Sequence, residues 1–182
     1  DAVLHGAGII EDSSIEKKSF LSFERVFDTK ADSTSILSRK LRPEQLKWIL
    51  LFSSISGRFG NNGQYDYAAA NETVNRLAWQ MDSQWPKTRV LAINWGPWSS
   101  SGMASEGVQY LLQAQGITPI DPAVGRQFFV DEMTYGSKGE VEIIAGKGPW
   151  EHKADQVLSS VFEASFLLLH VRELTKIAER SR

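Results

Sequence analysis

The sequence predicts an α/β fold in which parallel strands are joined by crossover helices. Four short runs rich in Val, Ile and Leu have the length of buried strands. Roughly forty to fifty residues separate the start of each run from the next, and helix-like stretches fill those intervals. Strands that alternate with helices in this way form a parallel sheet, because a parallel connection needs a crossover. The runs are DAVLHGAG, KWILLFSS, RVLAINW and EVEIIAG, which begin at Asp1, Lys47, Arg89 and Glu140.

The first interval contains a helical pattern with an unusual charge in it. We expect this helix to begin at Ser22, a residue type suited to capping, and to end before Pro43. Lys30 lies at helical spacing within its apolar face, which is a strange place for a lysine that only meets water. The apolar face consists of Phe23, Val26, Phe27 and Leu37.

Two further helices and a long irregular stretch follow. One helix is expected from Tyr65 to Met81, where a run of alanines allows a neighbouring backbone or ligand to come close. Another is expected from Ala123 to Met133. The stretch from Gly96 to Pro122 is rich in Gly, Ser and Pro, with room for a short helix near Leu111, and such stretches often form lids over sites.

The pattern changes after Trp150. We expect residues 1–150 to form the α/β unit and residues 151–182 to be a helical linker or the start of a neighbouring region. From Ala154 to Arg180 the sequence predicts one additional C-terminal helix, with apolar residues around most of its circumference. Such a helix is expected to be buried against another domain or another copy of the chain.

Composition excludes several classes of function. Lys and Arg number 20 against 22 Asp and Glu, so nothing indicates a basic face for nucleic acid or an anionic membrane. The chain has no cysteine, and its three histidines lie far apart, so we expect no disulfide, no thiolate nucleophile and no metal site. We find no signal pattern and no long apolar run, which makes a cytoplasmic protein the expectation.

The stretch LFSSISGRFGNNGQYDYAAANETVNRLA carries the pattern that points to chemistry. Tyr67 and Asn71 are four residues apart and share a helical face. Ser54 precedes Tyr67 by thirteen residues, which is enough chain to turn and bring the helix back past the strand end. Each residue also has an ordinary interpretation: Tyr67 as core, Ser54 as a strand end, Asn71 as surface, and Lys30 as a lysine that reaches out to water.

Taken together, these residues resemble the ketoreductase domains of modular polyketide synthases, in the short-chain dehydrogenase superfamily. The resemblance covers Asp1 to about Pro149 and rests on the Ser-to-Tyr spacing, YxxxN, HGAG after the first strand and NWGPW after the third. It implies the second half of a Rossmann-like, doubly wound parallel sheet. It also implies a catalytic tetrad of Lys30, Ser54, Tyr67 and Asn71, with the lysine supplied by the preceding helix in FDTKADS.

The family's reaction is the NADPH-dependent reduction of a β-ketoacyl group, carried on the phosphopantetheine of an acyl carrier protein, to a β-hydroxyacyl group. Tyr67 would donate the proton, and Lys30 is the cation expected to move the pKa of the phenol toward neutrality. Ser54 would hydrogen-bond the substrate oxygen as negative charge develops. Asn71 would hold the lysine or a relay water in place.

The resemblance also assigns residues around the tetrad. Gly6, Ala7 and Gly8, and Gly96 with Pro97, are expected beside the cofactor, with a strand-ending turn as the less favoured alternative for Gly6 and Gly8. Trp98 is expected either at the pocket mouth or in a structural role, and Met103 at the start of the lid.

Stereochemistry has its own pattern in this family. Ile10, Glu11 and Asp12 stand where one class carries LDD, and Phe59 replaces the tryptophan that marks the other class. Both features predict a D-configured, usually 3R, hydroxyl. The alternative is that Glu11 and Asp12 solvate a loop or cap a short helix.

The sequence contains no GxGxxG, so we expect the nucleotide-binding first half to be missing and the chain alone to be inactive. Its partners would be that upstream half, neighbouring synthase domains and the acyl carrier protein. A non-catalytic structural or assembly module derived from a ketoreductase is the alternative. A free-standing oxidoreductase is disfavoured because YxxxK is absent, and the sequence before Asp1 would discriminate between these possibilities.

Overall fold

A computed structural model describes residues 1–99, 114 and 116–149. Contacts divide the chain into two units, Asp1–Lys147 and Gly148–Arg182, and the helices and strands described below belong to the first. Met103, the short helix expected near Leu111 and the helix expected from Ala154 lie outside the described residues.

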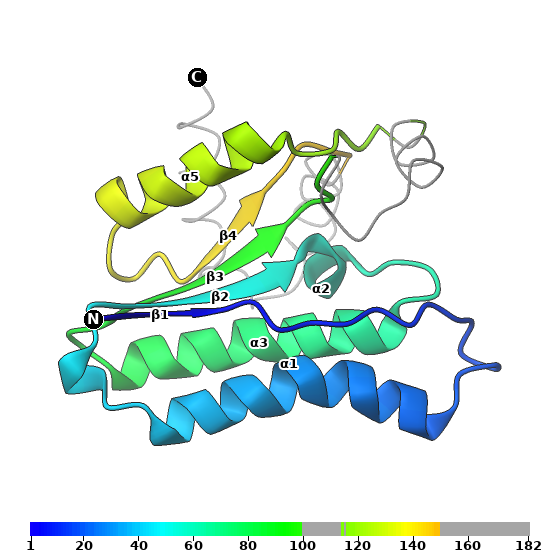
Figure 1. Cartoon of the computed structure of the whole chain (residues 1–182), viewed down its shortest axis with the longest axis horizontal. Coiled ribbons are helices and arrows are strands. Elements are labelled where there is room, and N and C mark those ends of the chain that lie inside the picture. The colour runs from blue at the N-terminus through cyan, green and yellow to red at the C-terminus, as the bar shows by residue number, and fades with distance from the viewer. Residues whose placement is uncertain (100–113, 115, 150–182) are drawn as a thin grey trace, which may run out of the picture. The chain divides into compact units, whose positions relative to one another are not determined.

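The four predicted strands are confirmed, and all of them are parallel. They are β1 (Ala2–His5), β2 (Trp48–Ser54), β3 (Arg89–Trp95) and β4 (Glu142–Ala145), in the spatial order β1-β2-β3-β4 (Figure 1). Leu4 pairs with Leu50, and Leu50 pairs with Leu91. The carboxyl ends of the strands therefore meet at one edge of the sheet, which is where ligands bind in open α/β folds.

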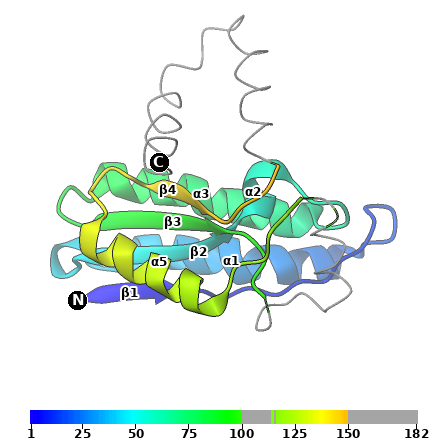
Figure 2. The same cartoon turned by 90° about the horizontal axis from the view of Figure 1, so that it is seen from above.

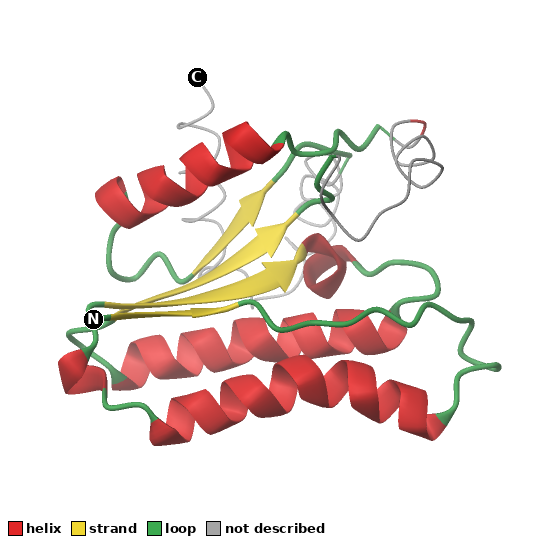
Figure 3. Ribbon diagram, viewed as in Figure 1, coloured by secondary structure: helices red, strands yellow, loops and turns green. Residues whose placement is uncertain are grey.

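The helices are α1 (Phe20–Lys40), α2 (Ile55–Phe59), α3 (Tyr65–Gln84) and α5 (Pro122–Tyr135), with a short 3-10 turn at Pro43–Gln45 (Figure 3). The expected cap at Ser22 is wrong. The Ser19 side chain caps α1 instead and accepts a hydrogen bond from the backbone N–H of Ser22 at 3.2 Å. Among the described residues, no helix is long and apolar enough to cross a membrane.

Helix α2 was not predicted, because the sequence suggests only a Gly-rich turn after Ser54. The Ser54 side chain caps this helix by accepting the Ser56 N–H at 3.2 Å. Gly57 is a poor helix former, but its missing side chain allows α2 to approach α3. A Cβ at Gly57 would lie 2.8 Å from the Cβ of Asn71. The close approach of two helices therefore overrides the local preference of the chain.

Helices α1 and α3 lie side by side on one face of the sheet, and α5 covers the other (Figure 1, Figure 2). Successive strand residues alternate between the two faces. Ile49 and Leu51 pack with α3, whereas Leu50 and Phe52 belong to the cluster under α5. Because both faces are covered, the strands appear in the sequence as continuous apolar runs.

Candidate active site

The four residues of the expected tetrad come from three elements and meet near the carboxyl end of β2. Lys30 lies in the middle of α1, Ser54 ends β2, and Tyr67 and Asn71 lie in the first half of α3. Their exposed fractions are 4%, 8%, 7% and 0%, respectively. The Nζ atom of Lys30 is 5.8 Å from the centroid of the Tyr67 ring. The structure therefore brings together the groups that the sequence singled out.

Lys30 points into the protein and not toward water. Its Nζ donates a hydrogen bond to the backbone oxygen of Phe52 at 2.7 Å. Burial lowers the pKa of Lys30 to about 8, because the charged form loses its hydration. His5, at the end of β1, lies close by and bonds to Ser33 through its Nε2 at 2.8 Å. Burial and the charge of Lys30 lower the pKa of His5.

Burial raises the pKa of the Tyr67 phenol. Interactions with Ser54 and Asn71 act in the opposite direction, and the negative charge of Asp12 raises the pKa further. The sequence led us to expect a pKa lowered by Lys30, and the direction is the reverse in this structure. The physical reason is that loss of hydration of the phenolate outweighs its hydrogen bonds. Tyr67 is therefore held in its protonated form.

Asn71 bonds to its own helix and not to Lys30. Its Nδ2 donates to the backbone oxygen of Tyr67 at 2.7 Å. Its Oδ1 is buried without a hydrogen-bond partner in the part of the chain that the structure describes. A buried amide oxygen without a partner costs free energy, which fits a position that a water or a bound group completes.

The glycines expected beside the cofactor have packing roles that the structure makes visible. A Cβ at Gly8 would lie 2.9 Å from the Cε of Lys30, so Gly8 leaves room for the lysine. Gly6 and Ala7 remain exposed after β1. Gly96 donates to the backbone oxygen of Ala145 at 2.7 Å, and a Cβ there would come within 3.3 Å of that oxygen. Pro97 accepts the Ile120 N–H at 2.7 Å, so this turn ties β3 to the segment before α5.

The residues expected to control stereochemistry divide into two groups. Asp12 is exposed and accepts a hydrogen bond from Gln64 Nε2 at 3.0 Å, directly before α3, and Phe59 is partly buried at the end of α2. Trp98 packs on Trp95 with ring centroids 4.9 Å apart, and a Cβ at Gly125 would lie 2.4 Å from its ring. This packing favours the structural interpretation of Trp98.

Glu11 is turned toward α1, where Arg25 and Ser22 bind its carboxylate. Hydrogen bonds from Arg25 and Ser22 lower the pKa of Glu11 to about 2. Neither Glu11 nor Asp12 caps a helix among the described residues, because α1 begins at Phe20 and Ser19 caps it. The capping alternative for these two residues is therefore wrong.

An ion pair beside Tyr67 was not expected from the sequence. Lys18 Nζ lies 2.6 Å from Asp66 Oδ2, and both side chains are buried. In the sequence Lys18 is one of two consecutive lysines, and Asp66 lies in the first turn of α3. Their partnership depends on the fold, and no short sequence pattern could have revealed it.

Comparisons with known proteins identify the family and agree with this fold. The model of the KR domain family matches residues 1–100, and the chain belongs to this family. A polyunsaturated fatty acid synthase of Thraustochytrium sp. is 33% identical over 144 residues, which cover 79% of this chain and 5% of that protein. Polyketide synthase PksN of Bacillus subtilis is 32% identical over 155 residues, covering 80% of this chain and 3% of that protein.

Solved ketoreductase structures show the same fold. The ketoreductase from the first module of phoslactomycin biosynthesis in Streptomyces sp. HK803 matches with a TM-score of 0.73 and 30% identity. The match covers 82% of this chain and 34% of the ketoreductase. The first ketoreductase of the tylosin polyketide synthase matches with a TM-score of 0.70 and 30% identity, over 85% of this chain and 33% of that one. The Rossmann-like fold expected from the sequence is therefore confirmed, and the chain spans about a third of these ketoreductases.

Proposed function

We propose that this chain is the half of a polyketide synthase ketoreductase domain that carries the catalytic residues. The complete domain would reduce a β-ketoacyl group, held on the phosphopantetheine of an acyl carrier protein, to a β-hydroxyacyl group with NADPH. The observation that carries the proposal is the burial of Lys30 and Tyr67 side by side at the carboxyl end of the strands. Family membership, from a match to residues 1–100, supports it.

Reduction of a ketone requires a hydride at carbon and a proton at oxygen. The nicotinamide cofactor would supply the hydride when bound. Tyr67 supplies the proton, and its raised pKa keeps the phenol protonated at neutral pH, ready to act as an acid. The cation of Lys30, 5.8 Å from the ring centroid, stabilises the phenolate that forms when the proton leaves.

Ser54 is arranged to donate a hydrogen bond. Its Oγ accepts the Ser56 N–H at 3.2 Å, and its side chain also hydrogen-bonds Tyr67, which places the hydroxyl beside the proton donor. Donation to the substrate oxygen would orient the ketone and stabilise the charge that develops on it. Asn71, with its unpaired Oδ1, would bind a water that returns a proton to the site.

The chain offers the nicotinamide side of a cofactor site and not the phosphate side. The exposed backbone at Gly6 and Ala7, together with Lys30 and Tyr67, would hold the nicotinamide half. Phosphates are usually bound by a Gly-rich turn at a helix N-terminus, and the sequence contains no GxGxxG. We therefore assign the nucleotide half to a preceding segment of a longer protein, beside further synthase domains.

For the product we propose the D-configured, 3R hydroxyl. Asp12 stands at the last position of the LDD-like stretch and is bonded to Gln64, three residues before Tyr67. Phe59 occupies the position of the tryptophan that marks the other class.

The direct test replaces Tyr67 by Phe in the complete domain, this chain joined to its nucleotide-binding half. Loss of a general acid lowers the rate by about 100- to 10,000-fold, so reduction of a β-ketoacyl thioester should stop while folding is retained. The rate is followed by NADPH consumption. Tyr65→Phe is the matched control, because Tyr65 stacks on Phe23 outside the site. Turnover near the wild-type rate in Tyr67→Phe contradicts the assignment.

A further inference from the structure

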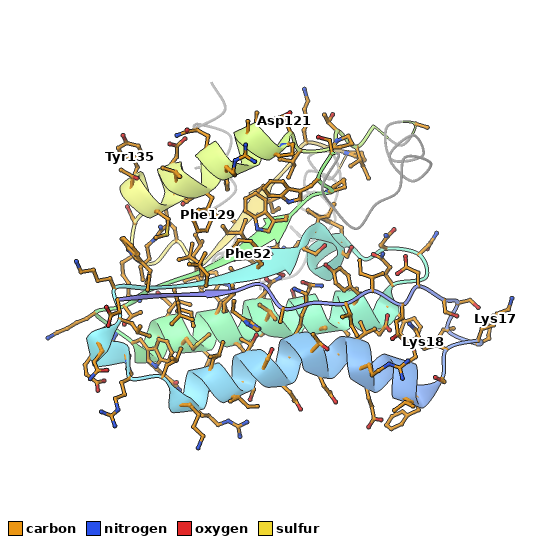
Figure 4. The ribbon with its side chains drawn as sticks, viewed as in Figure 1. Lys17, Lys18, Phe52, Asp121, Phe129 and Tyr135 are labelled. Carbon is orange, nitrogen blue, oxygen red and sulfur yellow. The ribbon has the colours of Figure 1, made fainter. Side chains whose placement is uncertain are left out.

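The ion pair between Lys18 and Asp66 is the most deeply buried in the part of the chain that the structure describes. The Nζ–Oδ2 distance is 2.6 Å, and the side chains are 2% and 1% exposed. Lys17, next to it, points to the outside, whereas Lys18 turns inward (Figure 4). Removing two charges from water costs free energy that their attraction often does not recover. Stability alone therefore does not explain why this pair is buried.

Each partner of the pair makes one more hydrogen bond. Asp66 Oδ1 accepts the backbone N–H of Tyr67 at 2.9 Å. Lys18 Nζ donates to the backbone oxygen of Glu11. The pair thus forms a continuous connection from the backbone beside Asp12 to the backbone of Tyr67.

A second connection runs parallel to the first. Asp12 Oδ2 accepts from Gln64 Nε2 at 3.0 Å, and the Ser13 N–H donates to the Gly63 oxygen at 2.9 Å. Gly63 has a φ of +77°, a conformation that favours glycine. The loop of residues 11–18 is fastened to residues 63–66 at both ends, but the Asp12–Gln64 bond is exposed and the Lys18–Asp66 pair is buried.

From this arrangement we infer that Lys18 and Asp66 are positioning residues, which fix the loop carrying Asp12 on one side of Tyr67 and so determine the side from which the ketone enters. The inference rests on the proposed reductase function. Exposed polar contacts are worth little, because water competes for them and side-chain freedom opposes them. Without the buried pair, the loop retains mainly such contacts. Asp12 would then occupy several positions, and the substrate could approach from either side.

The test uses the double variant Lys18→Met/Asp66→Asn in the complete domain. Asn at position 66 still accepts the Tyr67 N–H, and no unpaired charge remains buried, so the domain should fold. With the N-acetylcysteamine thioester of a β-keto acid, we expect the share of the minor hydroxyl configuration and the KM to rise by about tenfold each. A tenfold change corresponds to about 1.4 kcal/mol, which is the size expected for the loss of one contact that holds the loop in place. The kcat should change much less, because Tyr67 and Lys30 are untouched.

The matched control removes another Lys–Asp ion pair, whose aspartate, like Asp66, lies on α3. Lys138 binds Asp82, near the far end of α3, and these side chains are 35% and 16% exposed. Lys138→Met/Asp82→Asn should leave both the product ratio and the KM unchanged. If the Lys18→Met/Asp66→Asn variant gives the wild-type ratio and KM, the positioning role is overturned, while the proposed reduction stands.

A measurement without substrate keeps the two proposals separate. Hydrogen–deuterium exchange of the 182-residue chain should become about tenfold faster in residues 11–18 of Lys18→Met/Asp66→Asn, and stay unchanged in the control. Unchanged exchange in this loop overturns the inference even if the wild-type domain reduces nothing. A wild-type domain that fails to reduce any β-ketoacyl thioester contradicts the proposed function instead.

Discussion

The two faces of the sheet are built from different chemistry. The face under α5 is aromatic: Phe52 packs against Trp95 and Phe129, with ring centroids 5.7 and 6.0 Å apart (Figure 4). The face under α1 and α3 buries charged and polar groups, among them Lys30, Asn71 and Asn75. The α5 face also buries Arg89, but this cation is paired with Glu132 at 2.9 Å, whereas Lys30 bonds to a backbone oxygen and forms no ion pair among the described residues.

The difference between the two faces indicates which of them has a role besides stabilising the fold. Aromatic pairs add favourable energy to the burial of their area, whereas a buried polar atom costs free energy unless it is bonded. Asn71 and Asn75 each leave Oδ1 without a partner among the described residues, and the aromatic face has a single comparable atom, Trp95 Nε1. The face that carries the larger cost also carries the candidate site.

The polar face is itself uneven along α3. Further along α3 than Tyr67, Asn75 donates a hydrogen bond to Asn94 at 3.0 Å, and Asn94 donates one to Glu142 at 3.1 Å. Arg76 and Trp79 also donate to Glu142, at 3.0 and 3.1 Å. This network joins α3 to β4 through several bonded side chains. Near Tyr67, by contrast, Lys30 and Asn71 donate to backbone oxygens, those of Phe52 and Tyr67.

The largest effect should follow from removing the charge on the polar face. Lys30→Met in the complete domain is expected to lower the rate of ketone reduction by at least about 100-fold, as for loss of a group that stabilises developing charge. Folding should persist, because replacing a buried cation by an apolar side chain of similar length removes a desolvation cost. Steady-state rates and thermal unfolding check both parts.

Lys40→Met is the control for this variant, since Lys40 lies on the same helix at its exposed end. Its rate should equal that of the wild type. Comparable losses in the two lysine variants would mean that Lys30 acts through general charge or helix stability and not through the site.

An effect of intermediate size is expected from substituting two glycines, one on each face of the sheet. Gly57→Ala would force a Cβ to 2.8 Å from Asn71, and Gly125→Ala would force one to 2.4 Å from the Trp98 ring. Overpacking costs about 1 to 3 kcal/mol in unfolding free energy, so both variants should be less stable in urea titrations. Only Gly57→Ala should also slow reduction, because it moves Asn71. Equal activity losses would remove the distinction between the faces.

The smallest effect is a dependence of stability on pH. Burial lowers the pKa of Lys30 from 10.5 to about 8, so the unfolded chain binds more protons between these values. The cost of burying the charge is complete well below pH 8 and is relieved as the pH rises through 8 toward 10.5, so stability rises with pH over this range. The unfolding free energy of wild type relative to Lys30→Met should rise on the order of 1 kcal/mol between about pH 7 and pH 9.

Urea unfolding of both chains across this range measures the effect. The pKa of Tyr67 is raised from its ordinary value of 10.0, so titration of this phenol does not change the unfolding free energy between pH 7 and pH 9. Parallel curves for the two chains would show that Lys30 keeps an ordinary pKa in the folded protein.

Much of the fold and the central residues of the site could be predicted from the sequence. The four strands are present because each apolar run is short and buried on both faces, and α1, α3 and α5 follow the helical period of their apolar residues. The pairing of Tyr67 with Asn71 is a property of one helix, since residues four apart share a face. Lys30 stood out because a lysine inside an apolar stripe conflicts with its surroundings.

The features that could not be predicted from the sequence depend on contacts between residues that are distant in the chain. The cap at Ser19, the helix at α2 and the room that Gly8 leaves for Lys30 arise from contacts across the fold. The direction of the Tyr67 pKa depends on how deeply the phenol is buried, which no spacing encodes. The ion pair of Lys18 with Asp66 joins a loop to a helix, and it exists because α1 and α3 lie side by side. Local patterns specify elements, whereas burial and charge at a site are set by the packing of those elements.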